Sequence, residues 1–443
     1  MAYLITGGTL IDGTGAEPVA GSLAMDEERI VATGAAADLW AEGRAGVARI
    51  DATGATVMPG LIDAHCHITF DEPFSTTELF FHRREGLSAL VAAYNARKVL
   101  RAGVTGILDA DCVYSTSIDL RDAIEAGVAE GPRIACGGNA LFTSVGGTAG
   151  MLIPDEGRLG YSKVTAGRDE IVQEVRRQIK GGVDWIKVHV TGLVPRQREA
   201  GEIQVWTLDE MKAVVETAHD LNIPVVGHCR NASSTRDAAK AGFDMILHAT
   251  FMDEEALEAV VEAKVPLVPS LTFQQVLADY GHKVGANRTF QKIFEREIID
   301  SSVMLSRAWR EGVPMLAGSE SGFSITPYGE WHWRELQVFM EHLGMTAMEA
   351  IHCATGASGR SLGLAGEVGT LEADKLADVI VVRGDVAKDV TLLGVQDNIR
   401  HVFKGGRAVD LETPLAERRS IPGWRVANYS TAPLTRATAF GEG

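Results

Sequence analysis

The sequence predicts an α/β protein, a (β/α)8 TIM barrel with a small β domain made from both chain ends. Three observations support this prediction. Glycine-punctuated β-rich pieces occur at both ends, strand-like apolar runs alternate with helical segments between them, and there are eight such runs. The 443 residues leave room for a barrel of more than about 200 residues and a companion domain.

The two ends of the chain share a β-rich texture. YLITGGTLIDGTG, GSLAMDEERIVATG and ARIDATGATVMPG lack a helical period and are broken by glycine turns. The same texture returns in GEVGTLEADKLADVIVVRG and NIRHVFKGGRAVD. We therefore expect residues 1–58 and 365–425 to form one β domain, residues 59–364 the barrel, and residues 426–443 a tail that covers the surface or an oligomer neighbour.

The middle of the chain supplies the barrel. Its expected strands are VMPGLIDAHCHI, GVTGILDAD, RIACGG, WIKVHVTG, IPVVGHC, MILHAT, VPLVPSL and VPMLAGSES. Between two of them, LDEMKAVVETAHDLN places its apolar residues largely on one face, which predicts a helix capped by Thr207 with Glu210 three residues on. The glycine-rich stretch 136–151 has no phosphate-binding pattern and is expected to be a mobile loop over the site.

Composition excludes several classes of protein. Hydrophobic residues make up 46% and charged residues 23%, which indicates a folded globular chain. The net charge of −17 disfavours nucleic acid and anionic membranes as partners. No apolar run reaches the ~20 residues of a membrane span, and five scattered cysteines argue against a disulfide framework, so we expect a cytoplasmic protein.

Candidate site residues lie at the ends of the predicted strands. His65 and His67 share one face of a strand because side chains alternate, although such a pair alone is weak support for a metal site. Four more predicted strands end in groups that suit a metal site: Lys187, His228, His248 and Glu320. Barrel active sites lie at the carboxyl ends of the strands, so these groups should converge.

These motifs together resemble a known family. PGLIDAHCHI, IKVHVTG, VVGHC and LHAT, followed by GTLEADKLADVIVV, are similar to the amidohydrolase superfamily, in the branch of imidazolonepropionase-like and prolidase-like proteins. The segment from IKVHVTG to MDEEAL is also similar to phenylurea and molinate hydrolases. The resemblance implies that the end domain is a composite β-sandwich.

The resemblance also implies a metal centre and its ligands. His65 and His67 would bind the more buried ion, and His228 and His248 the second. Lys187, carboxylated by carbon dioxide, would bridge them, because a carbamate offers an anionic oxygen whereas an ammonium repels a dication. We expect two zinc ions per chain, with iron, manganese or cobalt as alternatives.

The last strand departs from the family pattern. The family usually has aspartate in a sequence like GTD, whereas this chain reads GSE. Glu320 would reach the metal differently, act only as a proton shuttle, or leave one metal site weak. The implied reaction is attack of metal-bound hydroxide, with Glu320 carrying the proton to the leaving nitrogen and His248 as the second catalytic residue.

Four residues are candidates for substrate binding. His189 should face the cavity of Lys187 and contact the oxyanion or the substrate, or else hydrogen bond within the barrel rim. Arg230 would pair with a substrate carboxylate or simply be solvated. Tyr328 and Trp331 suit an apolar substrate, and core packing explains them equally well.

The sequence therefore predicts a metal-dependent hydrolase that cleaves a C–N bond in an amide, urea, carbamate or dipeptide. Two alternatives stay open: a one-metal cyclic-amide hydrolase or deaminase, and a catalytically degenerate barrel that binds a ligand. The expected partners are a small-molecule substrate and further copies of the chain.

Overall fold

The computed structural model of the chain describes residues 1–74, 84–147, 160–192, 202–418 and 430–441. Its strands are β1 (Tyr3–Leu10), β2 (Val19–Asp26), β3 (Arg29–Thr33), β4 (Ala48–Asp51), β5 (Ala55–Pro59), β6 (Leu61–Cys66), β7 (Val104–Asp109), β8 (Arg133–Cys136), β9 (Ala140–Phe142), β10 (Ser162–Val164), β11 (Ile186–His189), β12 (Thr191–Gly192), β13 (Ile203–Gln204), β14 (Val225–Cys229), β15 (Met245–His248), β16 (Leu267–Val268), β17 (Val379–Arg383), β18 (Ile399–Lys404) and β19 (Arg407–Ala408). Its α-helices are α1 (Ala35–Ala41), α2 (Glu85–Arg101), α3 (Thr116–Glu125), α4 (Arg168–Lys180), α5 (Leu208–His219), α6 (Ala232–Ala241), α7 (Glu254–Ala263), α8 (Thr272–Tyr280), α9 (Arg288–Arg310), α10 (Arg334–Val338), α11 (Ala347–Cys353) and α12 (Arg436–Phe440).

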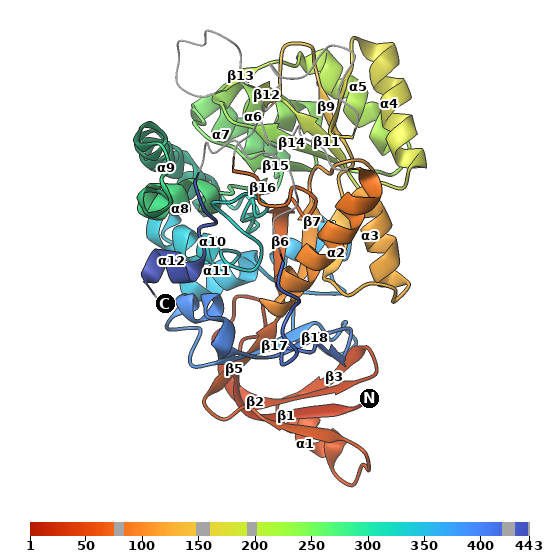
Figure 1. Ribbon diagram of the computed structural model, residues 1–443, viewed down its shortest axis with the longest axis vertical. Helices are drawn as coiled ribbons and strands as arrows, with labels where there is room; N and C mark the ends of the chain where they lie inside the picture. The colour runs from red at the N-terminus through yellow and green to blue at the C-terminus, as the bar shows by residue number, and fades with distance from the viewer. Residues whose placement is uncertain (75–83, 148–159, 193–201, 419–429, 442–443) are drawn as a thin grey trace.

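Both ends of the chain contribute to one sheet. Its strand order is β19-β18-β17-β5-β1-β2-β3, with β4 paired to β1. The join lies where β17 runs antiparallel to β5, and Figure 1 shows these strands together at one end of the molecule. The shared sheet agrees with the common texture of the two ends. A two-sheet sandwich and the domain boundaries given above stay predictions.

The middle of the chain forms parallel strands with helices between them. β6, β7 and β8 form one sheet, and β9, β11, β14, β15 and β16 lie within a second. Residues 313–321 lie between these sheets, because Leu316 N donates to Leu267 O at 2.9 Å and Ala64 N donates to Ala317 O at 2.8 Å. The predicted α/β alternation is therefore present, whereas one closed eight-stranded ladder stays a prediction.

The predicted helix between two of these strands is confirmed as α5. Thr207 accepts a hydrogen bond from Glu210 N at 3.3 Å, and the Glu210 carboxylate accepts one from Thr207 N at 2.9 Å. This reciprocal capping box satisfies backbone N–H groups that the first helical turn leaves open. Met211 and Val214 are buried on the inner face, as the apolar spacing predicts.

Two expectations about loops need comment. The stretch 136–151 is not all loop, because β9 within it pairs with β10 and β11, and residues 148–151 lie outside the described part. In the predicted tail, residues 426–429 are likewise not described, but Leu434 O accepts a hydrogen bond from the Trp331 indole N–H at 2.7 Å. The described part of the tail thus contacts the body of the protein.

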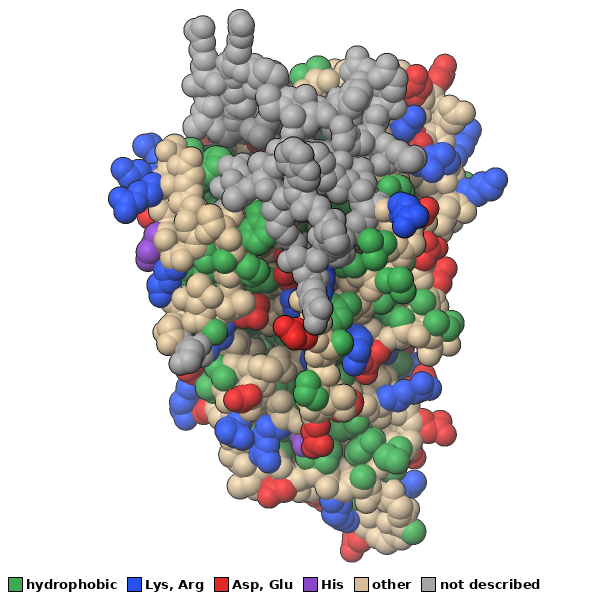
Figure 2. All heavy atoms as spheres, viewed as in Figure 1, with side chains coloured by type: hydrophobic (Ala, Val, Ile, Leu, Met, Phe, Trp, Pro, Cys, Tyr) green, Lys and Arg blue, Asp and Glu red, His purple; other side chains and the backbone are tan. Residues whose placement is uncertain are grey.

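The surface and the cysteines fit the composition. Figure 2 shows acidic and basic side chains interspersed over one face. All five cysteines are buried free thiols, as expected for a chain without a disulfide framework. Within the described ranges, every helix is too short or too polar to cross a membrane.

Candidate metal centre

The predicted ligands converge at the carboxyl ends of the parallel strands. His65 lies in β6, Lys187 in β11, His228 in β14 and His248 at the end of β15, and all four side chains are buried. Glu320 follows the last strand-like segment and is partly buried. Parallel strands bring these sequence-distant residues to one edge, as the strand assignment predicts.

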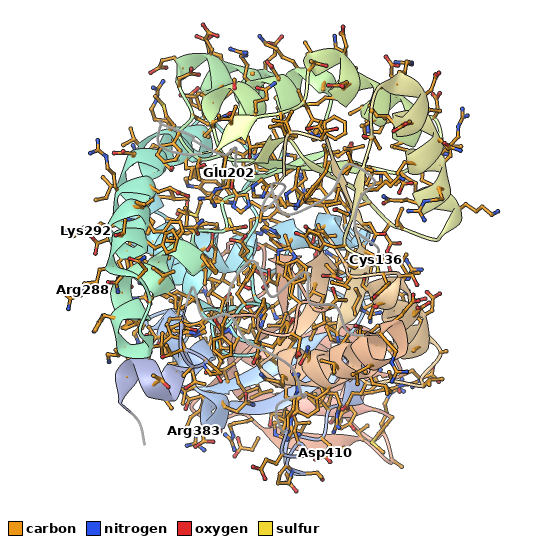
Figure 3. The ribbon with its side chains drawn as sticks, turned by 45° about the horizontal axis from the view of Figure 1, so that its top comes forward. Cys136, Glu202, Arg288, Lys292, Arg383 and Asp410 are labelled. Carbon is orange, nitrogen blue, oxygen red and sulfur yellow. The ribbon has the colours of Figure 1, made fainter. Side chains whose placement is uncertain are left out.

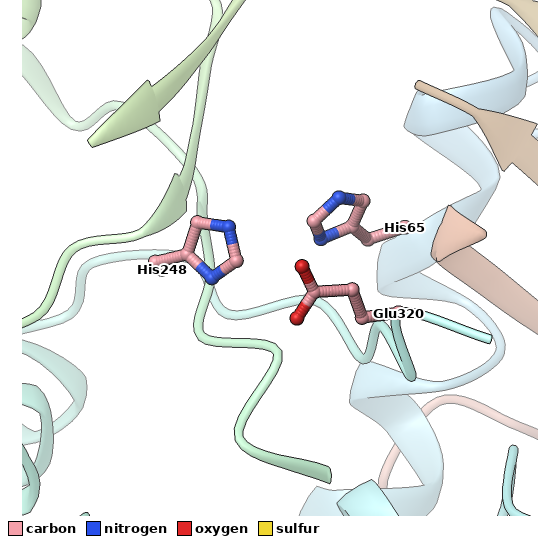
Figure 4. Close-up of side chains that lie close together, drawn as sticks. All are labelled: His65, His248 and Glu320. Atoms are coloured by element: carbon pink, nitrogen blue, oxygen red, sulfur yellow. The ribbon is translucent and has the colours of Figure 1, made fainter. Parts of the chain in front are cut away.

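Three of the predicted ligands form a compact group. One ligand atom each from His65, His248 and Glu320 lie within 4.8 Å of one another. Figure 4 shows the Glu320 carboxylate pointing between the two imidazole rings. A carboxylate and two imidazoles are a donor set that suits zinc and other divalent transition metals.

His228 extends this group on its far side. Its Nδ1 lies 3.1 Å from His248 Nε2. Two nitrogens bound to one ion at about 2.0–2.1 Å, with angles near 100°, lie about 3 Å apart, so this separation fits a shared ion. Buried His248 Nδ1 has no hydrogen-bond partner in the described part of the chain. The residues present therefore fit a divalent metal.

Neighbouring polar groups determine which ring nitrogen faces the centre. Ser270 Oγ lies 2.7 Å from His65 Nδ1, and Glu202 Oε2 lies 2.8 Å from His228 Nε2. These contacts leave Nε2 of His65 and Nδ1 of His228 directed inward, because each neutral imidazole has one donor and one acceptor nitrogen. Figure 3 shows Glu202 among the inner elements, whereas Lys292 lies on the outer helix α9.

Burial sets the protonation of the cluster. Desolvation lowers the pKa of His65, His228 and His248, which favours the neutral imidazole that binds metals. Burial also lowers the pKa of Lys187, although nearby Asp111 opposes this. Burial raises the pKa of Glu320 to about 8, so its carboxyl can hold a proton near neutral pH.

Asp63 ties the first and last strands of the site together. Its Oδ1 accepts hydrogen bonds from His65 N and Ser319 N, both at 3.0 Å. Its Oδ2 lies 2.6 Å from His332 Nδ1 and also contacts Ser319 Oγ. One buried carboxylate thus sets the positions of His65 and Glu320 relative to each other.

Several strand ends at the site have unusual backbone. His248, Ser270 and Glu320 have φ of 68°, 53° and 55°, a left-handed conformation that is uncommon for residues with a side chain. Gly318 is needed for close approach, because a Cβ there would lie 2.7 Å from the Cβ of His65. Such backbone turns the functional side chains inward from the strand ends.

Two of the predicted substrate residues hold the fold instead. The Tyr328 hydroxyl donates to His67 O at 2.6 Å and accepts from Asp71 N at 3.0 Å. The Trp331 ring is fully buried, and its N–H donates to Leu434 O. Both polar atoms are used by the backbone, so these contacts favour the packing interpretation over substrate contact.

The other two predicted substrate residues are tied to carboxylates. His189 Nε2 lies 2.8 Å from Asp111 Oδ2, which agrees with the rim interpretation. Burial lowers the pKa of His189 to about 3, and a neutral ring that donates through Nε2 has only an acceptor at Nδ1. This geometry disfavours the oxyanion role.

Arg230 is not solvated, so that expectation is wrong. Its side chain is 13% exposed, its Nη2 binds Glu297, and its Nε lies 3.6 Å from Glu202. Two carboxylates offset one guanidinium, because an unpaired buried charge would be costly. The pairing leaves Arg230 less available for a substrate carboxylate.

The sequence argument did not identify several residues at the centre: Asp63, Asp111, Glu202 and Ser270. Asp111 carried a signal, since it ends the predicted strand GVTGILDAD on the same face as Asp109. Ser270 carried a similar signal, since it lies near the end of the predicted strand VPLVPSL, whereas Glu202 lies outside the predicted strands and carried none.

Comparisons with known proteins agree with this geometry. The profile of the amidohydrolase family matches residues 56–409. Ochratoxinase from Aspergillus niger is 27% identical over 431 residues, covering 91% of this chain and 86% of the relative. A crystal structure of a Xaa-Pro dipeptidase with bound methionine in the active site aligns with a TM-score of 0.79 and 28% identity, covering 93% and 100% of the two chains. Molinate hydrolase aligns with a TM-score of 0.75 and 23% identity over 96% and 99%, a likeness of fold alone.

Proposed function

The chain belongs to the amidohydrolase family, and on that premise we propose that it is a metal-dependent hydrolase of C–N bonds in small amides or dipeptides. The observation that supports this best is the convergence of His65, His248 and Glu320 within 4.8 Å. Ureas and carbamates belong to the same proposal. Amides and dipeptides come first because ochratoxinase and the Xaa-Pro dipeptidase have the higher identities.

Six residues would hold two divalent ions, which we propose to be zinc: His65, His67, Lys187, His228, His248 and Glu320. Lys187 is 1% exposed, and burial favours its neutral amine, the form that adds to carbon dioxide with loss of a proton. The resulting carbamate provides an oxygen ligand. Bound ions would polarise the scissile carbonyl and lower the pKa of a coordinated water toward ~7.

Glu320 moves the proton in this proposal. Its carboxylate takes a proton from the attacking water and delivers it to the leaving nitrogen, which cannot depart as an amide anion. The backbone holds Glu320 in place, since Glu320 N donates to His65 O at 2.7 Å and Glu320 O accepts from Thr326 at 2.9 Å.

We also propose that the two parallel sheets and residues 313–321 complete a closed barrel, as their connecting hydrogen bonds suggest. The end sheet would then belong to a composite sandwich. Association into homo-oligomers is proposed from the sequence alone.

The test compares hydrolysis by the zinc-loaded protein with that of two variants. N-acyl amino acids, their uncharged amide analogues, Xaa-Pro dipeptides and a phenylurea form the substrate panel. His228→Ala and Glu320→Gln should each lower kcat/KM by at least about 100-fold, because each removes part of the metal or proton machinery. His282→Ala, an exposed histidine on the surface, should retain activity.

Full activity of His228→Ala on a confirmed substrate would contradict the metal assignment. A strong preference for the N-acyl amino acids over their uncharged amides would count against an apolar urea or carbamate as the substrate. Absence of turnover on the whole panel by the loaded protein would contradict the proposed substrate class.

A further inference from the structure

Asp111 lies at the centre of a cluster that joins three strands. It follows β7 by two residues, and its side chain is 2% exposed. Its Oδ1 lies 2.9 Å from His67 Nδ1 and 3.9 Å from Lys187 Nζ, and its Oδ2 lies 2.8 Å from His189 Nε2. One carboxylate thus contacts a side chain beyond β6 and two in β11.

Packing sets the plane of the His67 ring, but it does not set which edge of the ring faces the metal centre. Phe70 stacks on the ring with centroids 4.2 Å apart and planes within 2°, and Phe323 meets its edge at 5.8 Å. A half-turn of the imidazole about the Cβ–Cγ bond would keep this stacking and exchange Nδ1 with Cδ2 and Nε2 with Cε1. Another group must therefore decide which nitrogen faces the metal centre.

Asp111 lies where it can fix the orientation of the His67 ring. A carboxylate only accepts hydrogen bonds, whereas a neutral imidazole carries one N–H. Neither His67 Nδ1 nor Asp111 Oδ1 has another hydrogen-bond partner among the described residues. Asp109 lies on the same face, and its Oδ1 accepts from Ile68 N at 3.0 Å, whereas Asp111 is the carboxylate that contacts His67.

We propose that Asp111 is a positioning residue that holds His67 as the Nδ1–H tautomer, so that Nε2 is the metal-binding nitrogen. The same carboxylate holds His189 through Nε2 and so couples it to the metal ligand. This inference rests on the proposed function, since it concerns a ligand of the same centre.

The first test measures zinc and cobalt affinity by competition with a chelator. The side chain introduced by Asp111→Asn has one acceptor oxygen and one NH2 donor, whereas His67 and His189 each present a ring N–H to it. One of these two ring N–H groups would therefore face the NH2 group. Loss of such a partner typically weakens metal affinity 10- to 100-fold, and we expect that range. Asp119→Asn, which removes an exposed carboxylate from nearby α3, should bind like the unchanged protein.

The outcomes separate the two claims. Tight binding by the unchanged protein with equal affinity in Asp111→Asn would overturn the role of Asp111 and leave the proposed function intact. Failure of the unchanged protein to bind either ion would contradict the proposed function itself. The thermal midpoints of the metal-free proteins report whether the substitution acts only through folding.

A second test needs no variant of Asp111. Imidazole ¹⁵N NMR of the zinc-loaded protein reports which nitrogen of each histidine carries the proton, and His67→Gln assigns the His67 signals. A protonated Nδ1 and a metal-bound Nε2 on His67 support the proposal. A metal-bound Nδ1 on His67 would overturn it, even if Asp111→Asn does not fold.

Discussion

Replacing Asp63 with asparagine should destabilise the protein by about 3 kcal/mol. Asp63 is buried, with two backbone donors on Oδ1 and the His332 ring on Oδ2. Asparagine keeps the acceptor for His65 N and Ser319 N but turns an N–H toward His332 Nδ1. His332 cannot move its proton to Nε2, because Nε2 accepts from Gly329 N at 3.1 Å.

The size of the effect follows from that single mismatch. A hydrogen bond to a charged group contributes about 1.5–3 kcal/mol, and a buried unpaired donor costs about 1–3 kcal/mol. For 443 residues, an unfolding entropy of about 2.1 cal/mol/K per residue converts 3 kcal/mol into a lower Tm of about 3 °C.

Scanning calorimetry of the metal-free protein measures this change without a contribution from ion binding. The control is the same substitution in a His332→Ala background, where the cost should fall to about 1 kcal/mol because the mismatch is gone. A loss below about 1 °C, or an equal loss in both backgrounds, would refute the reasoning.

Three further predictions concern stability. Gly318→Ala should cost about 1–3 kcal/mol and weaken zinc binding, because its Cβ would press on the Cβ of His65; unchanged Tm and affinity would contradict the close approach. Burial raises the pKa of Glu335 to about 7, above about 4.3 when unfolded, so its ionisation opposes folding. As the pH rises from about 4.3 to 7, the Tm of the unchanged protein should therefore fall relative to that of Glu335→Gln, and above about pH 7 the difference between the two Tm values should stay constant. A constant difference at every pH would exclude this titration. Thr207→Ala should cost about 1 kcal/mol through loss of the cap on Glu210 N, whereas Thr207→Ser should cost little, both measured by calorimetry.

Local pattern predicted much of the site. The spacing of His65 and His67 on one strand face, and the placing of His228 and His248 after apolar runs, follow from the alternation of side chains along strands. Thr207 and Glu210 define a helix start by chemistry confined to four residues. Each of these features depends on neighbours in the sequence.

The features that were missed depend on contacts across the fold. Asp63 meets His332 across 269 positions, and Ser270 meets His65 across 205. The surroundings of Arg230 are of the same kind, because Glu297 comes from the distant helix α9. Hydrophobic periodicity and turn residues do not indicate such distant partners. Burial is also why Arg230 forms a structural ion pair in place of the solvated charge that was expected.

The central claim is a two-metal centre held by carboxylated Lys187, and metal content per chain tests it most directly. Protein grown in zinc-supplemented medium and purified without chelator should contain close to two ions per chain by mass spectrometry. Lys187→Ala should retain one or fewer, because the bridging carbamate is lost. One ion or none in the unchanged protein, or two ions in Lys187→Ala, would contradict the account.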